Sequence, residues 1–261
     1  MKTILLAAAA LATLSLGGTA RAADLPPAYK APPPPVVYSW TGCYLGAGGG
    51  YGMWNQDTYA ETFPALVPLT AATTAGGRGW FGTVQVGCDY QIGSSWLIGA
   101  FGDYDFGSIK GTYSPAATTG GVNFSSQEKM SSAWAVGGRI GWLPFDRLLT
   151  FVSAGYTQAR FDQMNFFSVV PPFATVDLSI AAHTYRGWFI GSGYEYAIGW
   201  LPGLYWKTEY RYSTYRPDDL PFFFTSTGVV GTAGINSKKY VQTVRSELVW
   251  RFGGGAVMAN Y

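Results

Sequence analysis

Residues 79–91 read GWFGTVQVGCDYQ, and in this stretch apolar or aromatic side chains recur at every second position. One parity carries Trp80, Val84, Val86, Cys88 and Tyr90, and the other carries Phe81, Thr83, Gln85, Asp89 and Gln91. Successive side chains of a β-strand point to opposite faces of the sheet. The alternation therefore predicts a strand with one apolar face and one mostly polar face.

The same pattern recurs after residue 37 and predicts eight antiparallel strands. They fall near residues 40–52, 79–91, 95–107, 131–143, 147–161, 184–197, 203–214 and 240–252. The connections alternate between long ones, near 53–78, 108–130, 162–183 and 215–239, and short ones, near 92–94, 144–146 and 198–202. Membrane barrels have this asymmetry, because their periplasmic turns are short and their extracellular loops are long. The predicted fold is all-β, an eight-stranded antiparallel up-and-down transmembrane β-barrel.

A secreted soluble sandwich is the alternative, since it would bury the apolar face and expose the charged one. The tryptophans favour the membrane, because most lie at or near predicted strand ends, where membrane barrels carry aromatic girdles. They are Trp40, Trp80, Trp96, Trp134, Trp142, Trp188, Trp200, Trp206 and Trp250. Only 12% of the residues are charged, against about one quarter in an ordinary soluble domain.

The N-terminus has the features of a secretory signal peptide. Lys2 supplies the basic region, residues 4–16 form the apolar core, and residues 20–22 read ARA, an A-x-A cleavage site. Proline-dense residues 23–38 predict an extended periplasmic spacer, with a docking strip for a periplasmic partner as the alternative. The predicted organisation is a signal peptide (1–22), a proline-rich periplasmic arm (23–38), an outer-membrane β-barrel (39–252) and a C-terminal extension (253–261).

Residues 40–52, WTGCYLGAGGGYG, combine glycines and aromatic residues without a charge. They do not match the phosphate-binding pattern G-x-G-x-x-G, because Tyr51 and Met53 stand where the third glycine is required. As a strand, this stretch has mostly glycines at its inward positions, from Gly42 to Gly52. The interior of an eight-stranded barrel is just wide enough for side chains to fill. We expect these glycines to leave room for long charged side chains from other strands.

Eleven charged residues fall on the inward faces of the predicted strands. They are Asp89, Asp103, Asp105, Arg139, Glu195, Lys207, Glu209, Arg211, Arg245, Glu247 and Arg251. Either they form a salt-bridged lumen charge network that closes the barrel, or they line a narrow water path that selects small ions. Desolvated charges are tolerated when they are paired, so the nearly balanced signs favour the closed barrel.

Cys43 and Cys88 lie on the outward faces of the first two predicted strands, near the same end. If the antiparallel register places them opposite each other, a cross-strand disulfide is geometrically possible. The periplasm is oxidising, so we predict this disulfide. The alternative is two free thiols at the membrane interface.

The sequence offers little for catalysis, cofactors or metals, since it contains no C-x-x-C or H-E-x-x-H motif. His183 is followed by Thr184 and Tyr185, so the H-x-S arrangement of lipid A deacylases is absent, and no sequence feature supplies a carboxylate to orient it. Loss of Lys2 and Arg21 with the signal peptide lowers Lys+Arg from 17 to 15, equal to the 15 Asp+Glu. This neutral balance disfavours a nucleic-acid partner. We expect no enzyme activity, catalytic residue, cofactor or metal site.

Two predicted loops contain unusually apolar stretches, FFSVVPPF at 166–173 and PFFF at 221–224. Exposed apolar patches often mark contacts, so adhesion or packing against a neighbouring barrel is one hypothesis. Folding over the barrel mouth, or resting in the lipopolysaccharide interface, is the other.

Several stretches resemble the alphaproteobacterial porin-family small outer-membrane barrels, the RopB-like group related to the OmpA transmembrane barrel. They lie at residues 40–52, 87–108, 137–157, 191–200, 205–215 and 246–252. The most specific are the hairpin R-x-G-W…D-R-L-L at Arg139 to Leu149 and the strand E-Y-R-Y at Glu209 to Tyr212.

The resemblance implies an eight-stranded barrel exported by the Sec route and inserted by the barrel assembly machinery, which recognises an aromatic-ended final strand such as residues 248–252. Residues 253–261 follow that strand, which departs from the family pattern. Members are envelope proteins, surface antigens and porins, without a catalytic motif. We expect a mainly structural envelope role in contact with outer-membrane lipid and lipopolysaccharide, with a narrow porin-like channel or an adhesin acting through the apolar loops as alternatives. The oligomeric state stays open.

Overall fold

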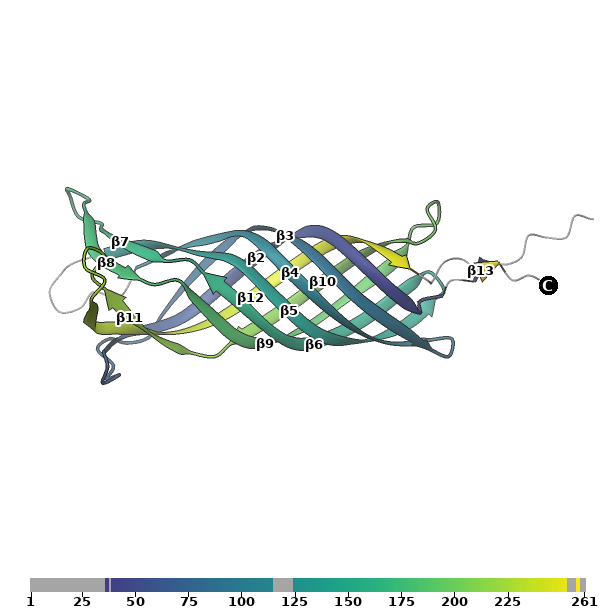
Figure 1. Ribbon diagram of the computed structural model, residues 1–261, viewed down its shortest axis with the longest axis horizontal. Coiled ribbons are helices and arrows are strands. Elements are labelled where there is room, and N and C mark those ends of the chain that lie inside the picture. The colour runs from purple at the N-terminus through teal and green to yellow at the C-terminus, as the bar shows by residue number, and fades with distance from the viewer. Residues whose placement is uncertain (1–35, 38, 115–123, 253–256, 259–261) are drawn as a thin grey trace, which may run out of the picture. The chain divides into compact units, whose positions relative to one another are not determined.

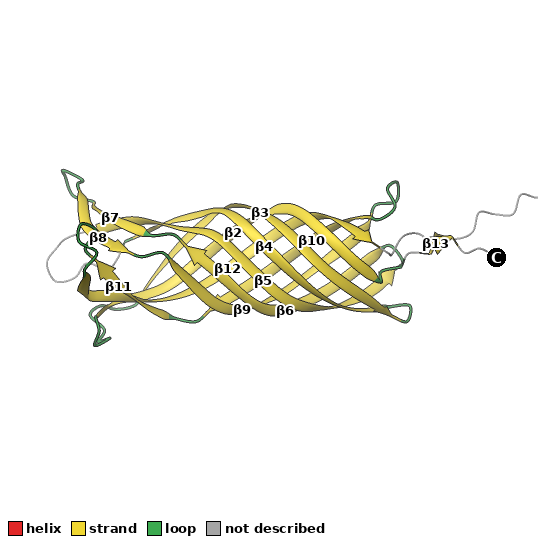
Figure 2. Cartoon of the chain, viewed as in Figure 1, coloured by secondary structure: helices red, strands yellow, loops and turns green. Residues whose placement is uncertain are grey.

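A closed ring of long antiparallel strands forms the wall of the protein (Figures 1 and 2). The computed structural model describes residues 36–37, 39–114, 124–252 and 257–258. The ring consists of β2 (Gly42–Thr62), β3 (Thr73–Ile92), β4 (Trp96–Tyr113), β5 (Phe124–Phe145), β6 (Leu148–Phe161), β9 (His183–Ala197), β10 (Leu204–Tyr215) and β12 (Val230–Phe252). Each long strand pairs with the next along the chain, and β12 closes the ring by pairing with β2. The predicted antiparallel barrel is confirmed.

Three short strands extend the wall at one end, namely β7 (Met164–Ser168), β8 (Thr175–Ile180) and β11 (Asp218–Phe223). They join β5 to β12 through the pairs β5–β7, β7–β8, β8–β11 and β11–β12. Figure 1 shows them gathered at the end that we call the loop end. The opposite, turn end carries the short connections after β3, β5 and β9. No helix in the described ranges is long and apolar enough to cross a membrane.

The chain segments before and after the barrel meet in a separate two-stranded sheet. β1 (Val36–Val37) pairs antiparallel with β13 (Val257–Met258). The predicted signal peptide (1–22) and most of the predicted arm (23–38) and extension (253–261) lie outside the described residues.

Several strands extend farther toward the loop end than the sequence pattern predicted. β2 runs to Thr62 rather than to residue 52, β5 begins at Phe124 rather than at 131, and β12 begins at Val230 rather than at 240. The predicted loops at 53–78 and 215–239 were therefore too long. Alternation continues in these stretches, but polar residues such as Gln56 and Thr58 occupy inward positions, so the apolar signal fades while the backbone ladder persists.

The outward face carries the apolar side chains that the alternation assigned to it. Trp80, Val84, Val86 and Tyr90 are all exposed on β3. Ten residues separate Trp80 from Tyr90, which at about 3.3 Å per residue and a tilt of about 40° spans about 25 Å along the barrel axis. This height matches the apolar band of an outer-membrane barrel.

Trp40 does not belong to an aromatic girdle, which corrects its assignment from the sequence. It is 1% exposed, its Nε1 donates to the carbonyl oxygen of Asp146 at 3.1 Å, and its ring lies 4.8 Å from that of Tyr205. Trp40 precedes β2, and its place near a predicted strand end was misleading, because the chain there turns into the barrel.

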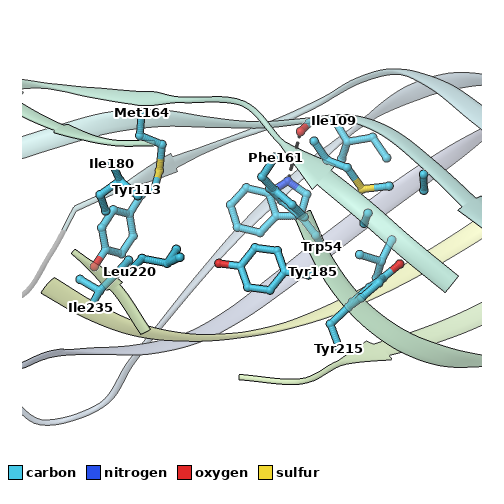
Figure 3. Packing of buried hydrophobic residues seen from close by; sticks show 14 of the residues in the cluster. Trp54, Ile109, Tyr113, Phe161, Met164, Ile180, Tyr185, Tyr215, Leu220 and Ile235 are labelled. Carbon is cyan, nitrogen blue, oxygen red and sulfur yellow. Dashed lines mark hydrogen bonds between the residues drawn. The ribbon is translucent and has the colours of Figure 1, made fainter. Parts of the chain in front are cut away.

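Apolar side chains fill both ends of the barrel interior. The loop-end cluster includes Trp54, Phe161, Tyr185 and Ile235, and Figure 3 shows Trp54 donating from its indole nitrogen to the carbonyl oxygen of Ile109, at 3.1 Å. The turn-end cluster includes Trp40, Tyr44, Leu97, Phe101, Leu149, Phe151, Phe189, Tyr205 and Val249. The inward-facing charged residues, which form the candidate site, lie partly between these two clusters and partly within them.

Candidate functional site: the charged interior of the barrel

All eleven charged residues predicted to face inward lie inside the barrel wall, and none is more than 7% exposed. They come from β3, β4, β5, β9, β10 and β12. The facing part of β2 supplies glycines instead. A Cβ on Gly46 would lie 3.3 Å from Oε2 of Glu247, and one on Gly50 would lie 2.6 Å from the ring of Phe81. These glycines therefore leave the room that the long side chains occupy.

Two arginines and two carboxylates form a compact cluster toward the turn end. Arg139 places Nη2 at 2.5 Å from Oδ2 of Asp89 and Nη1 at 3.2 Å from Oε2 of Glu195. Arg251 contacts the same two carboxylates, with Nη1 at 2.8 Å from Asp89 Oδ2 and Nη2 at 2.8 Å from Glu195 Oε1. Each charge therefore has two partners of opposite sign, and the cluster is neutral.

A second cluster spans the middle of the barrel and contains three cations and four carboxylates. Arg211 forms a bidentate ion pair with Asp103, in which Nη1 lies 3.0 Å from Oδ1 and Nη2 lies 2.8 Å from Oδ2. Arg245 reaches both Asp103, at 3.3 Å, and Asp105, at 2.8 Å. The remaining members are joined through Lys207, whose Nζ lies 3.1 Å from Glu209 and 3.4 Å from Glu247. Arg211 also contacts Glu209 at 3.3 Å, so the seven side chains form one connected network.

Apart from these two clusters, a further buried ion pair lies nearer the loop end, and the sequence analysis did not predict it. Lys239 contacts Glu128 at 2.5 Å and also donates to Gln56. All three residues fall in stretches that the sequence pattern assigned to loops, although each stands on the inward parity of its strand. Continuing the alternation past the predicted strand ends would have found them.

Aromatic rings separate and cover the charged groups. The guanidinium carbon of Arg211 lies 4.2 Å from the centroid of Phe189, and the ammonium of Lys239 lies 4.4 Å from that of Phe161. Cations over ring faces gain electrostatic attraction that grows when water is excluded. The rings thus fill the space between ion pairs and stabilise the cations.

The arrangement fixes the charges against one another. Removing one partner from a buried ion pair typically costs about 3–5 kcal/mol, because an uncompensated charge remains in a poorly solvated place. Chemically, the interior therefore presents these charges in pairs, each held by a partner of opposite sign.

The predicted disulfide is present. Cys43 and Cys88 stand opposite each other in the β2–β3 register and are joined through their sulfur atoms. The bond ties the first two long strands together near the turn end, on the outer wall.

His183 has a carboxylate partner that the sequence analysis did not find. Its Nε2 lies 2.9 Å from Oδ2 of Asp218, which is 35 residues away in the chain and belongs to β11. Among the described residues, no Ser, Thr or Cys side chain hydrogen-bonds to this imidazole. Nor does any group of three or more His, Cys, Asp or Glu in the described ranges stand where it could hold a metal ion.

The apolar loop stretches divide between the interior and the surface. Phe166 and Phe222 are buried in the loop-end cluster, with ring centroids 5.6 Å apart. Phe167, Phe173 and Phe224 are exposed. Packing over the barrel mouth therefore accounts for part of these stretches, and an apolar surface remains.

Comparison with known proteins agrees with the fold. No protein-family model matches the sequence. The 31 kDa outer-membrane immunogenic protein of Brucella melitensis is 28% identical over 263 residues, covering 97% of this chain and 100% of that protein, and the Brucella suis protein of the same name matches equally. The outer membrane protein OprG of Pseudomonas aeruginosa superimposes with a TM-score of 0.51 at 9% identity, covering 84% of this chain and 100% of that one. With its apolar outer wall, the chain is an outer-membrane β-barrel protein.

Proposed function

We propose that the protein is a closed structural barrel, which stabilises the outer membrane and presents loops at the cell surface. The observation that carries this proposal is the network of buried, mutually paired charges across the middle of the barrel. Porins with sixteen to eighteen strands leave an aqueous channel, whereas the interior of an eight-stranded barrel is just wide enough for side chains to fill. Here the interior is occupied by charged side chains from six strands and by buried rings from others.

Efflux from lipid vesicles tests this function directly. Full-length protein is refolded into vesicles that enclose a small sugar and an ion-sensitive dye, and a large general porin serves as the positive control. We expect release at the rate of protein-free vesicles. Release that rises in proportion to the amount of folded protein would instead support a narrow porin-like channel.

Several partners follow from this role as proposals. Lipid and lipopolysaccharide would surround the apolar wall, and the barrel assembly machinery would insert the chain after removal of residues 1–22. We also propose membership of the RopB-like group, on the strength of the motifs at Arg139 to Leu149 and Glu209 to Tyr212. The assignment can be tested by asking whether relatives that contain both motifs group with this chain in a sequence comparison, apart from relatives that lack the motifs.

Binding at the cell surface is a second candidate function, favoured by the exposed apolar side chains of the loop end. Phe173 is 64% exposed, Phe224 and Val229 are exposed on the connection between β11 and β12, and Val230 is exposed at the start of β12. The Brucella relatives are named as immunogenic, which agrees with surface exposure of such loops. Replacing Phe173 and Phe224 with serine should abolish binding to host-cell or bacterial surfaces if these side chains form the contact, and should leave it unchanged if they do not.

A further inference from the structure

A pocket of about 660 Å³ opens on the outer wall of the barrel near its loop end. Its lining includes the basic side chains of Arg186, Arg216 and Lys238 and the aromatic side chains of Tyr156 and Trp188. These residues stand on or next to β6, β9, β10 and β12, at positions that alternate with the buried ones. The pocket is therefore separate from the charged interior.

The local sequence explains why the wall is hollow at this place. The paired residues of β10 and β12 end with Thr214 opposite Tyr240, and Pro217, which follows closely, has no N–H to continue a ladder. On the neighbouring strand, Gly187 contributes no side chain to the lining. A Cβ at Gly187 would clash with the carbonyl oxygen of Thr214, so the close approach of these strands keeps the position small.

The three basic residues lie side by side on adjacent strands. The amide nitrogen of Arg216 donates to the carbonyl oxygen of Arg186 at 2.9 Å. Lys238 stands on the other side of Arg216, two residues beyond the Thr214–Tyr240 pair. Neighbouring strands are about 4.8 Å apart, so the three Cα atoms lie within roughly 10 Å.

Compensation from the protein itself reaches Lys238 but not the two arginines of this cluster, among the described residues. Within the described part of the chain, neither guanidinium has a hydrogen-bond or ion-pair partner, whereas Lys238 hydrogen-bonds to the side chain of Tyr240, whose ring centroid lies 5.1 Å from its ammonium. The carboxylate opposite Lys238 in the register is that of Asp57, which attracts the ammonium and also accepts from the hydroxyl of Thr74 at 2.8 Å. Like charges side by side on a sheet repel each other, so an anion from outside would relieve the repulsion.

The distribution of charge on the whole outer wall points to the same kind of ligand. Arg78, Lys110, Lys129 and Arg160 also face outward toward the loop end, on β3, β4, β5 and β6. Asp57, Asp162 and Asp219 stand at the same end, and Asp162 pairs with Lys129 at 3.0 Å, so the basic side chains are in excess there but not alone. At the turn end the described wall has a single basic residue, Arg147, whose guanidinium donates to the carbonyl oxygen of Ala197 at 3.0 Å. The basic side chains thus mark one membrane interface and not the other.

We propose that this pocket binds the phosphorylated glucosamine headgroup of lipid A. The proposal rests on the orientation expected of an outer-membrane barrel, in which long loops face outward and the loop end lies in the outer leaflet. A phosphate monoester carries a charge of about −1.5 to −2 at neutral pH, and the arginine fork matches its oxygens. Tyr156 and Trp188 lie beside the cations at the level of the aromatic girdle, where they can contact the sugar and the first acyl carbons.

Native mass spectrometry of the full-length protein released from detergent micelles tests this site, with a chelator present to remove divalent cations. The probes are diphosphorylated lipid A, the same lipid without phosphates, phosphatidylglycerol, and soluble glucosamine phosphate. The pocket variant combines Arg186→Gln, Arg216→Gln and Lys238→Gln. The matched control combines Arg78→Gln, Lys110→Gln and Arg160→Gln, which removes the same charge from the same end of the wall.

We expect the protein to retain one diphosphorylated lipid A in preference to the other probes, and the pocket variant to bind it at least about tenfold more weakly. The control variant should lose less than about threefold. Equal losses in both variants would overturn the site in favour of a diffuse charge effect. Equal binding of phosphatidylglycerol, or full competition by glucosamine phosphate, would overturn the assignment to lipid A.

Folding is checked by the mobility shift on unheated electrophoresis gels, and the single variants Arg216→Gln and Lys238→Gln replace the triple variant if it does not fold. Vesicle efflux is measured on the same preparations. Loss of lipid A binding by the pocket variant, with unchanged efflux, would support this site and would not bear on the proposed closed barrel. Efflux through the parent protein would contradict the closed barrel and would not bear on the lipid A site.

Discussion

Arg139 shows how a single interior charge links several strands of this barrel. Its guanidinium contacts two carboxylates from different strands, Asp89 on β3 and Glu195 on β9, and lies 4.7 Å from the ring of Tyr44. One side chain therefore connects three parts of the wall across the interior. Without it, Arg251 alone would have to compensate both carboxylates.

The substitution Arg139→Met should lower the free energy of unfolding by about 3–5 kcal/mol, because it leaves excess negative charge in a buried place. Urea unfolding in lipid vesicles, followed by tryptophan fluorescence, measures the change. Arg160→Met is the control, since this arginine faces outward and its loss should cost less than about 0.5 kcal/mol. Similar effects of the two substitutions would contradict the role given to the interior pairs.

Asp177 provides a pH-dependent contact between two loop-end segments. Its carboxylate accepts from the amide of Ser226 at 2.6 Å and from the Ser226 hydroxyl at 2.5 Å, and these hydrogen bonds lower the pKa of Asp177. Because the folded pKa lies below the unfolded value of about 3.9, the contact stabilises fully above that value and is lost as pH falls through the lower folded pKa.

Amide exchange at Ser226, measured by NMR, tests this contact. At pH 6 the substitution Asp177→Asn should speed exchange several-fold. The difference between variant and parent should begin to shrink below the unfolded pKa of about 3.9 and disappear as the pH falls through the lowered pKa of the folded carboxyl. A difference that persists unchanged to pH 2 would rule out the carboxylate as its cause.

The faces of the eleven predicted interior charges could be read from the sequence, because side chains of a strand alternate with a period of two. Their partners could not, since Arg245 meets Asp103 and Asp105 only through the register of non-adjacent strands across the barrel. Glu128 and Lys239 were missed because the predicted strands at 131–143 and 240–252 were begun too late. The carboxylate that holds His183 was missed for the related reason that Asp218 is distant in the chain.

At the scale of single elements, the short strands β7 and β11 are held by the side chains that they insert into the loop-end cluster. Phe166 is 1% exposed and packs against Phe222, whereas the adjacent Phe167 is 41% exposed. The two residues thus offer a matched pair on the same strand. Only one of them anchors it.

Limited proteolysis distinguishes the two phenylalanines. Phe166→Ala should speed cleavage within residues 162–182 at least about tenfold, because loss of a buried phenylalanine typically costs about 3–5 kcal/mol of packing. Phe167→Ala should leave the rate within about twofold of the parent. Equal acceleration by both changes would mean that the apolar contact does not hold the strand.

The disulfide stabilises the β2–β3 pair through the 45-residue separation that it closes. Replacing both Cys43 and Cys88 with serine should lower the free energy of unfolding by roughly 2–4 kcal/mol, mainly because the unfolded chain regains freedom. The measurement is urea unfolding with and without a reductant. The parent should lose stability in the reductant and approach the variant, and the variant should not respond to it.

Strand cores could be predicted more securely than strand ends. In β3 the outward residues Trp80 to Tyr90 are apolar because they meet lipid, and this produces a clear alternation. Beyond the aromatic girdle the outward residues meet water, as Asp57 does on β2, so both faces become polar while the ladder continues. The chain therefore contains strand there without the hydrophobic signal that marks it.

At the scale of the whole molecule, two surfaces with different chemistry share one wall. The outer surface is apolar between its aromatic girdles, and the inner surface combines ion pairs with buried rings. A closed ring of strands satisfies the backbone groups that face lipid, since every long strand has two neighbours. The envelope role depends on the interior remaining closed.

Single-channel recording in a planar lipid bilayer, in molar KCl with full-length refolded protein, tests this closure most directly. We expect a baseline without unitary steps at moderate voltages, because in the proposed closed barrel the paired side chains around Arg211 and Arg245 occupy the interior. Regular unitary steps that scale with salt, and that change in size when Asp103→Asn is introduced, would contradict a closed barrel and identify the charged interior as a conducting path.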